Sequence, residues 1–107
     1  MTNTIDIDNL TVLRESADLA TALMKVLANP DRLMLLCQIS QGEKAVGELE
    51  TLTGIQQPTL SQQLTVLREN QVVKTRREGK NIYYSVSSKP ALAIINVLAE
   101  QICKLDK

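Results

Sequence analysis

Apolar side chains recur every three or four residues along most of the chain, which is the spacing of one face of a helix. In the first such run, the repeating positions are Leu10, Leu13, Ala17, Ala20, Met24 and Leu27. This helix is expected to end at Asn29, because a residue that precedes a proline is pushed out of the helical region. Three further helices are predicted over residues 31–40, 46–53 and 57–70, and Gly54 provides a turn between the last two.

After residue 70 the hydrophobic period changes from about 3.6 to 2, the period of a β-strand. Residues 72–77 and 81–86 are β-prone, and Glu78, Gly79 and Lys80 lie between them. This pattern predicts a β-hairpin with basic residues around its tip. A fifth helix is expected from residue 91 to about residue 105.

The predicted fold class is therefore mainly α with a small β-hairpin, in the order ααααββα. We expect residues 1–107 to form a single domain, since one domain typically has about 100–150 residues. Residues 1–8 are polar and are expected to form a flexible tail.

The helix predicted over 57–70 has one apolar and one polar face. Leu60, Leu64 and Leu67 form the apolar stripe, and the opposite face carries small polar side chains near the helix start. A short helix, a glycine turn, a polar-faced second helix and a basic hairpin together make up a winged helix-turn-helix. In that unit the second helix enters the major groove of DNA and the hairpin, or wing, reaches the adjacent backbone.

Two groups of side chains are the candidates for contacts with DNA. The start of the fourth helix offers amides and hydroxyls for base edges, and a glutamine amide matches both the donor and the acceptor of adenine. The wing offers cations for phosphates, which are the main source of affinity for duplex DNA. The candidate DNA-binding residues are Gln56, Gln57, Thr59, Ser61, Gln62, Arg76, Arg77, Lys80 and Asn81. The same residue types are ordinary on a solvated helix and on an exposed strand edge. The DNA-binding interpretation is favoured because the polar helix follows a glycine turn and precedes a basic hairpin.

Composition argues against most catalytic and membrane functions. The 107 residues include no His, Trp or Phe and only four Gly, so the commonest general base and base-stacking platforms are missing. Residues 1–60 hold four basic and eight acidic residues, whereas residues 61–107 hold eight basic and four acidic ones. No signal peptide or membrane span is expected. We predict a cytoplasmic protein that is not an enzyme, needs no cofactor and does not bind a membrane.

Several short motifs occur in the same order and at the same spacing as in a known protein family, over roughly residues 10–105. They are Val46-Gly47-Glu48-Leu49, Leu60-Ser61-Gln62, Leu64, Leu67-Arg68, Arg76-Arg77-Glu78-Gly79 and Ile82-Tyr83-Tyr84. The chain resembles the ArsR/SmtB family of bacterial repressors, which implies a winged-helix protein that binds double-stranded operator DNA. Three positions depart from the family pattern: Ala45 and Gln56 stand where a serine caps a helix, and Gln63 stands where histidine is common. Each lost hydroxyl cap is expected to cost about 1 kcal/mol.

The chain lacks the residues of both metal-site types that recur in this family. One type needs a Cys-Val-Cys box on the third helix, and the other needs His residues on the last helix. The chain has Cys37 in the second helix and Cys103 in the last. This pair resembles the sulfide- and persulfide-responsive subgroup that includes the biofilm growth-associated repressors, which implies that the two cysteines are regulatory thiols and that no metal is bound. On the residues alone, Cys37 also fits a small buried hydrophobe and Cys103 an exposed residue near the chain end.

The predicted function is a dimeric transcriptional repressor that binds operator DNA when reduced and leaves it when persulfides or polysulfides modify Cys37 and Cys103. The homodimer is expected to form through the first and last helices, whose apolar stripes are wider than one core face requires. A repressor that senses general disulfide or peroxide stress through the same cysteines is an alternative. A thiol-disulfide exchange enzyme is another, although the chain lacks Cys-x-x-Cys spacing. A dimerisation adaptor without DNA binding is a third.

Overall fold

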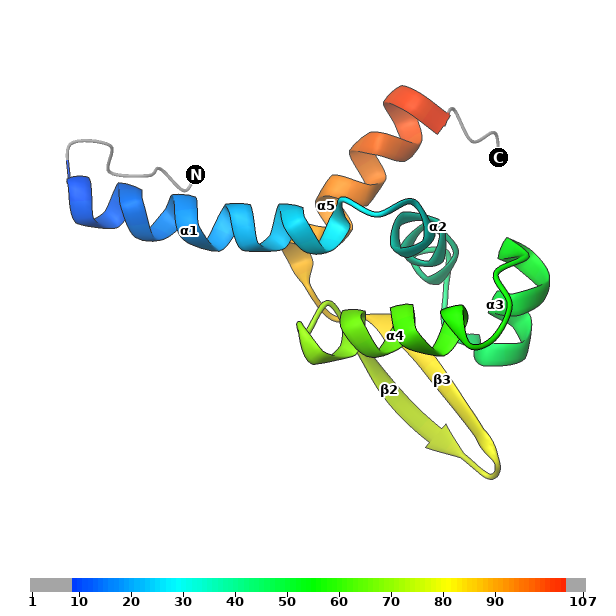
Figure 1. The fold of residues 1–107 in the computed structure, drawn as a ribbon. Helices are drawn as coiled ribbons and strands as arrows, with labels where there is room; N and C mark the ends of the chain where they lie inside the picture. Colours follow the sequence, from blue (N-terminus) through cyan, green and yellow to red (C-terminus); the bar gives the residue numbers. More distant parts are fainter. Residues whose placement is uncertain (1–8, 104–107) are drawn as a thin grey trace.

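The computed structural model describes residues 9–103, which contain five α-helices, a short π-helix and a three-stranded sheet (Figure 1). The elements in chain order are α1 (Leu10–Leu27), α2 (Pro30–Ile39), β1 (Lys44–Ala45), α3 (Val46–Thr53), α4 (Thr59–Glu69), β2 (Val73–Glu78), β3 (Asn81–Val86), α5 (Lys89–Leu98) and η1 (Ala99–Cys103). This order confirms the predicted fold class. The expected tail over residues 1–8, the expected end of the last helix near residue 105 and the side chain of Cys103 lie outside the described part of the chain.

Side-chain caps fix where several of these helices begin. Asn9 Oδ1 accepts hydrogen bonds from the backbone N–H groups of Thr11 (3.0 Å) and Val12 (3.2 Å) at the start of α1. Asn29 Oδ1 accepts one from the N–H of Arg32 (3.0 Å) at the start of α2. The first N–H groups of a helix have no partner within the helix, so these side-chain oxygens stabilise each helix start.

The starts of α3 and α4 lack the serine caps, as expected, but other side chains accept hydrogen bonds there. At α3, Ala45 has no side chain that can cap, but Glu48 Oε1 accepts a hydrogen bond from the Ala45 N–H at 2.8 Å. At α4 the N-cap is Pro58 and not Gln56 as expected, and Gln57 Oε1 accepts a hydrogen bond from the Ser61 N–H at 3.0 Å. Long side chains therefore replace at least part of what the missing serines would contribute at each helix start.

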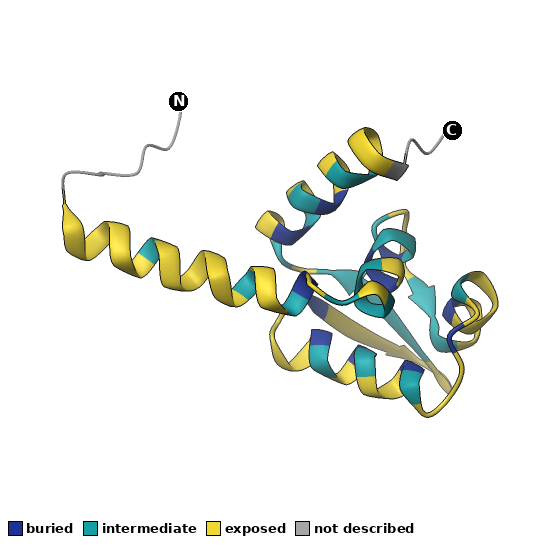
Figure 2. Cartoon of the chain, turned by 45° about the horizontal axis from the view of Figure 1, so that its top comes forward, coloured by how far each residue is buried: buried dark blue, intermediate teal, exposed yellow. Residues whose placement is uncertain are grey.

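The core is built from aliphatic side chains of α2 to α5, together with Leu27 at the end of α1, Ile55, Val72 and Val73. The largest fully buried side chains are Leu35, Leu36, Leu49, Leu60, Leu64, Leu67, Val72 and Ile95. The leucine stripe predicted for the fourth helix lies wholly inside this core. Because that stripe fixes the rotation of α4 about its axis, the opposite polar face is turned to solvent (Figure 2).

The sheet has three strands, one more than the predicted hairpin. Strand β3 lies between β1 and β2, and Lys44 pairs with Tyr84 while Ala45 pairs with Tyr83. A two-residue strand is too short to show an alternating pattern, which is why the sequence does not reveal β1. Its pairing fastens the wing to the chain just before α3. At the wing tip Gly79 has a φ of 65°, a left-handed conformation that suits a tight hairpin turn.

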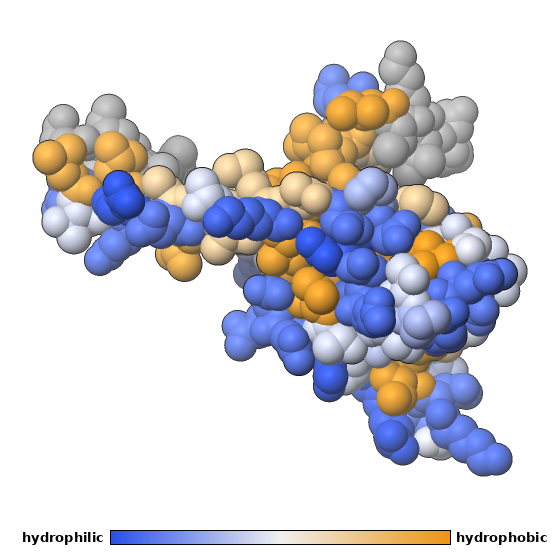
Figure 3. Space-filling view, viewed as in Figure 1, coloured by the Kyte–Doolittle hydropathy of each residue, from blue (hydrophilic) through white to orange (hydrophobic). Residues whose placement is uncertain are grey.

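Helix α1 and the end of α5 present apolar side chains to solvent. Of the eighteen residues in α1 only Leu27 is buried, while Leu10 and Leu19 are 76% and 75% exposed. Figure 1 shows α1 extending away from the rest of the protein, and Figure 3 shows apolar surface over α5. Within residues 9–103, every helix is too short or too polar to span a bilayer.

Candidate nucleic-acid interface

The chain passes from α3 into α4 through a turn that leaves the start of α4 accessible. Gly54 ends α3 in a left-handed conformation with a φ of 76°, and its N–H donates to the Glu50 carbonyl at 2.9 Å. Of the five predicted DNA-binding residues at the start of the fourth helix, four are exposed and Thr59 is half-buried. The exposed ones are Gln56, Gln57, Ser61 and Gln62. The structure thus places Gln56 and Gln57 just before α4 and the other three in its first turn, all at one end of the helix.

The side chain of Gln57 is hydrogen-bonded to Ser61, four residues further along the chain. Gln57 Oε1 accepts hydrogen bonds from the Ser61 hydroxyl (2.7 Å) and the Ser61 N–H (3.0 Å). The carbonyl oxygen of Gln57 is therefore occupied, and what remains for a bound molecule is its amide N–H₂ and the oxygen lone pairs of Ser61. The i,i+4 spacing of the two residues is the sequence signal that could have revealed this contact.

Gln62 and Gln63 are neighbours in the sequence but lie in different surroundings. Gln62 is exposed, and within the described part of the chain its amide makes no hydrogen bond, so both its donor and its acceptor are available to a base edge. Gln63 is half-buried, and its Oε1 accepts a hydrogen bond from Arg32 Nη1 at 2.8 Å. The departure from histidine at position 63 therefore affects a contact between α2 and α4.

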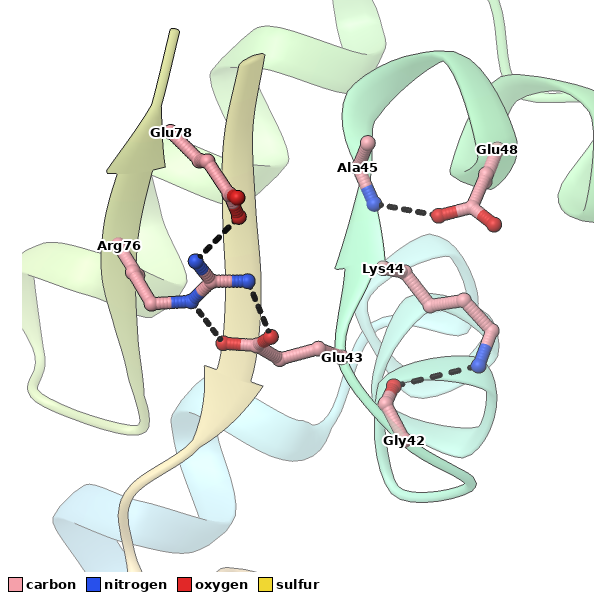
Figure 4. Close-up of polar contacts among 7 residues, drawn as sticks. All are labelled: Gly42, Glu43, Lys44, Ala45, Glu48, Arg76 and Glu78. Atoms are coloured by element: carbon pink, nitrogen blue, oxygen red, sulfur yellow. Dashed lines mark hydrogen bonds and ion pairs between the residues drawn. The ribbon is translucent and has the colours of Figure 1, made fainter.

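Arg76 lies between two carboxylates in the middle of β2, part-way along the wing (Figure 4). Its Nε and Nη2 donate to the two oxygens of Glu43 at 3.1 and 2.9 Å, and its Nη1 donates to Glu78 Oε1 at 2.7 Å. The guanidinium also stacks over the ring of Tyr83, 4.8 Å from the ring centroid. The hydrogen bond from Arg76 lowers the pKa of Glu43, and the hydrogen bonds to Glu43 and Glu78 raise the pKa of Arg76. Arg76 thus joins the wing to the loop before β1 and carries two neutralising partners.

The other predicted wing residues, Arg77, Lys80 and Asn81, are exposed. Arg77 follows Arg76 along β2, and successive side chains of a strand point to opposite faces. Lys80 and Asn81 are exposed at the tip. Among residues 9–103, neither Arg77 nor Lys80 has an ion-pair partner, which leaves these two charges available to an anionic ligand.

The two cysteines lie on different elements. Cys37 is half-buried on α2 and packs against the hydrophobic core. Cys103 is the last residue of η1, which continues α5, and α2 contacts α5. Helix α2 also contacts α1, α3 and α4, so Cys37 is on the most central helix of the fold. Within the described residues no three His, Cys, Asp or Glu side chains are grouped so as to hold a metal ion.

Comparison with known proteins identifies the family to which this fold belongs. Residues 29–75, from the cap of α2 to β2, match the model of the bacterial regulatory protein arsR family. A biofilm growth-associated repressor from Agrobacterium fabrum is 48% identical over 94 residues, which cover 88% of this chain and 80% of the relative. The chain belongs to the arsR family.

A solved structure and a second curated relative agree with membership of the arsR family. The transcriptional repressor BigR from Xylella fastidiosa superposes with a TM-score of 0.83 at 43% identity, covering 92% of this chain and 98% of BigR. The transcriptional activator HlyU from Vibrio cholerae is 34% identical over 92% of both chains. These relatives are regulators, and the prediction that the chain is not an enzyme is confirmed.

Proposed function

We propose that this arsR-family chain is a transcriptional repressor that works as one winged-helix domain and binds operator DNA through α4 and the wing. The observation that carries the proposal is the combination of an exposed Gln62 on α4 with the exposed cations Arg77 and Lys80 on the wing, none of which has a side-chain partner within residues 9–103. A base-reading amide and phosphate-binding cations on adjacent elements are what a winged helix needs. Relatives named as repressors support repression, and a regulator of bacterial promoters works in the cytoplasm.

The proposed active form is a homodimer that buries α1 and α5. Support comes from the apolar side chains that these helices leave exposed and from an apolar hollow of α5 lined by Ala93, Ile94, Val97 and Leu98. A second copy of the chain is the occupant we propose, since a two-fold interface uses the same patch on both subunits. Two recognition helices related by this symmetry would read a near-palindromic operator.

The proposed inducers are low-molecular-weight persulfides and polysulfides acting on Cys37 and Cys103. Attack of one thiolate on a sulfane sulfur of an inorganic polysulfide releases a hydrosulfide ion and leaves a sulfur chain on that cysteine. Attack of the second thiolate on that chain closes the bridge and releases a second hydrosulfide, so the polysulfide is both sulfur donor and oxidant. The central place of α2 supports this proposal, because a bridge from Cys37 would restrain the helix that contacts α4. The Vibrio cholerae relative has a solved structure described as reduced HlyU, which supports a redox role in this subgroup.

Metal ions are not expected to act as inducers. The chain has no His and two Cys, so one chain cannot assemble a closed four-ligand zinc site from imidazole and thiolate. Zinc, cadmium and arsenite at physiological concentrations should leave operator binding unchanged in a fluorescence anisotropy titration. A tight stoichiometric metal complex that releases the DNA would contradict the sulfur mechanism.

The DNA-binding proposal is tested with wing and helix variants on one operator fragment and on unrelated duplexes. Arg77→Ala or Lys80→Ala should weaken binding to every duplex and lower the slope of log affinity against log salt by about one, because one phosphate contact is lost. Gln62→Ala should instead weaken the preference for one base step by about 1–3 kcal/mol. Fluorescence anisotropy over a range of salt concentrations measures both effects.

Arg76 provides the matched control for the wing. Because Glu43 and Glu78 already neutralise its guanidinium, Arg76→Ala should reduce the salt slope less than Arg77→Ala does. Wing variants that bind like the wild type at every salt concentration would show that the wing does not reach the DNA. A wild-type protein without salt-dependent preference for its own promoter would instead favour the adaptor alternative.

A further inference from the structure

The side chain of Arg32 joins the end of α1 to the middle of α4. Its Nε donates to the Val26 carbonyl at 2.6 Å and its Nη2 to the Lys25 carbonyl at 3.4 Å, both in the last turn of α1. Its Nη1 donates to Gln63 Oε1 on α4 at 2.8 Å. One planar guanidinium on α2 therefore donates hydrogen bonds to α1 and to α4 at the same time, and Gln63 lies 31 residues after Arg32 in the chain.

The last turn of α1 is where this helix is attached to the core. Leu27 is its buried residue, and Leu23 and Val26 pack partly against the core. The last four carbonyls of a helix have no partner within the helix, and a cation is favoured there by the helix dipole. Arg32 supplies both the donors and the charge. Any tilt of α1 must therefore act on the turn that Arg32 holds.

Through Gln63, a change in the tilt of α1 would also move α4 and its DNA-binding surface. Gln63 is half-buried on α4 and directly follows Gln62, the exposed residue that we propose reads a base. The backbone of Arg32 is itself fixed, because its N–H donates to Asn29 Oδ1 at 3.0 Å. The contact between Arg32 and Gln63 thus restrains the position of α4 relative to the end of α1.

We propose that Arg32 and Gln63 are positioning residues that set the angle of the recognition helix against the dimer helix, and so the spacing of the two recognition helices. The inference rests on the proposed dimeric, DNA-binding function. A guanidinium suits this role because its donors have a fixed planar geometry, whereas a lysine ammonium is a point charge on a flexible stem. Neither residue is proposed to touch DNA.

The test compares Arg32→Lys, Gln63→Met and the double variant on a series of palindromic operators whose half-sites are moved apart or together by one or two base pairs. The wild type should prefer one spacing. Each single variant should lose about tenfold in affinity at that spacing and show a flatter profile, while its affinity for unrelated DNA changes less than twofold. The double variant should be no worse than either single variant, because both remove the same contact.

Gln38→Met is the matched control, since Gln38 is a half-buried glutamine of α2 without a hydrogen bond to its side chain in the described part of the chain. It should keep the wild-type spacing profile. Single variants with an unchanged profile, additive losses in the double variant, or an equal loss on specific and unrelated DNA with a lower melting temperature would each overturn the inference. A wild-type protein that prefers no operator would instead contradict the proposed function.

Discussion

Cys37→Ser and Cys103→Ser should each abolish the release of operator DNA by polysulfide, while the reduced variants bind the operator within about twofold of the wild type. Serine keeps the size of the side chain but its hydroxyl does not attack sulfane sulfur at neutral pH, so neither variant can close a sulfur bridge. Anisotropy titrations before and after polysulfide treatment measure the response. A tenfold loss of operator affinity in the wild type corresponds to a difference of only about 1.4 kcal/mol in binding free energy between the reduced and the bridged protein.

The bridge geometry is expected to select the oxidant. A direct disulfide requires Cα atoms within about 4.4–6.8 Å, and a wider pair closes only if the backbone moves. A bridge with one or two additional sulfur atoms spans a longer distance with less strain. We therefore expect the wild type to release DNA at lower concentrations of polysulfide than of hydrogen peroxide.

Mass spectrometry of the linked cysteine peptides separates the possible outcomes. Polysulfide-treated protein should yield a cross-linked peptide pair heavier than the disulfide form by one or more sulfur atoms. Ser40→Ala is a suitable control, because the Ser40 hydroxyl donates to the Cys37 carbonyl at 2.7 Å and does not take part in the sulfur chemistry. A single cysteine variant that still releases DNA, or a wild type that responds equally to peroxide, would contradict the persulfide mechanism.

The parts of the fold that the sequence predicts well depend on repeating local patterns. The leucines of α4 recur at helical spacing, and this spacing alone indicates which face enters the core. The change of period after residue 70 and the single glycine at position 79 likewise indicate the hairpin and its turn. Each of these signals lies within about ten residues of chain, where local propensity and burial act together.

The contacts that organise the site are not local, and no periodicity reveals them. Glu43 and Arg76 are 33 residues apart, and Arg32 and Gln63 are 31 residues apart. The basic cluster predicts phosphate contacts for both Arg76 and Arg77. The structure places Arg76 between two carboxylates, whereas Arg77 has no ion-pair partner in the described part of the chain. Sequence alone gives the composition of such a cluster, whereas its individual partners depend on how distant segments pack.

Val97→Glu should convert the proposed dimer into monomers and lower operator affinity by about a hundredfold or more. Val97 is 56% exposed in the single chain, so the substitution should not disturb the folded monomer. Within a two-fold interface the new carboxylate appears twice and is buried without a partner, which costs several kcal/mol. Two linked recognition helices gain about 10²–10⁴ in affinity over one, and the monomer loses this gain. Analytical ultracentrifugation and anisotropy measure the two effects.

Asn96→Glu is the matched control for this substitution. It introduces the same side chain one position earlier on α5, about 100° around the helix from Val97. Asn96 is exposed and is not part of the apolar hollow, so the control should remain dimeric and bind the operator like the wild type. Affinity for a DNA fragment with a single half-site should be the same in Val97→Glu, Asn96→Glu and the wild type, because each recognition helix is intact. If Val97→Glu stays dimeric, this face of α5 is not the dimer interface. If it is monomeric yet binds the full operator like the wild type, the operator is not read by two symmetric helices.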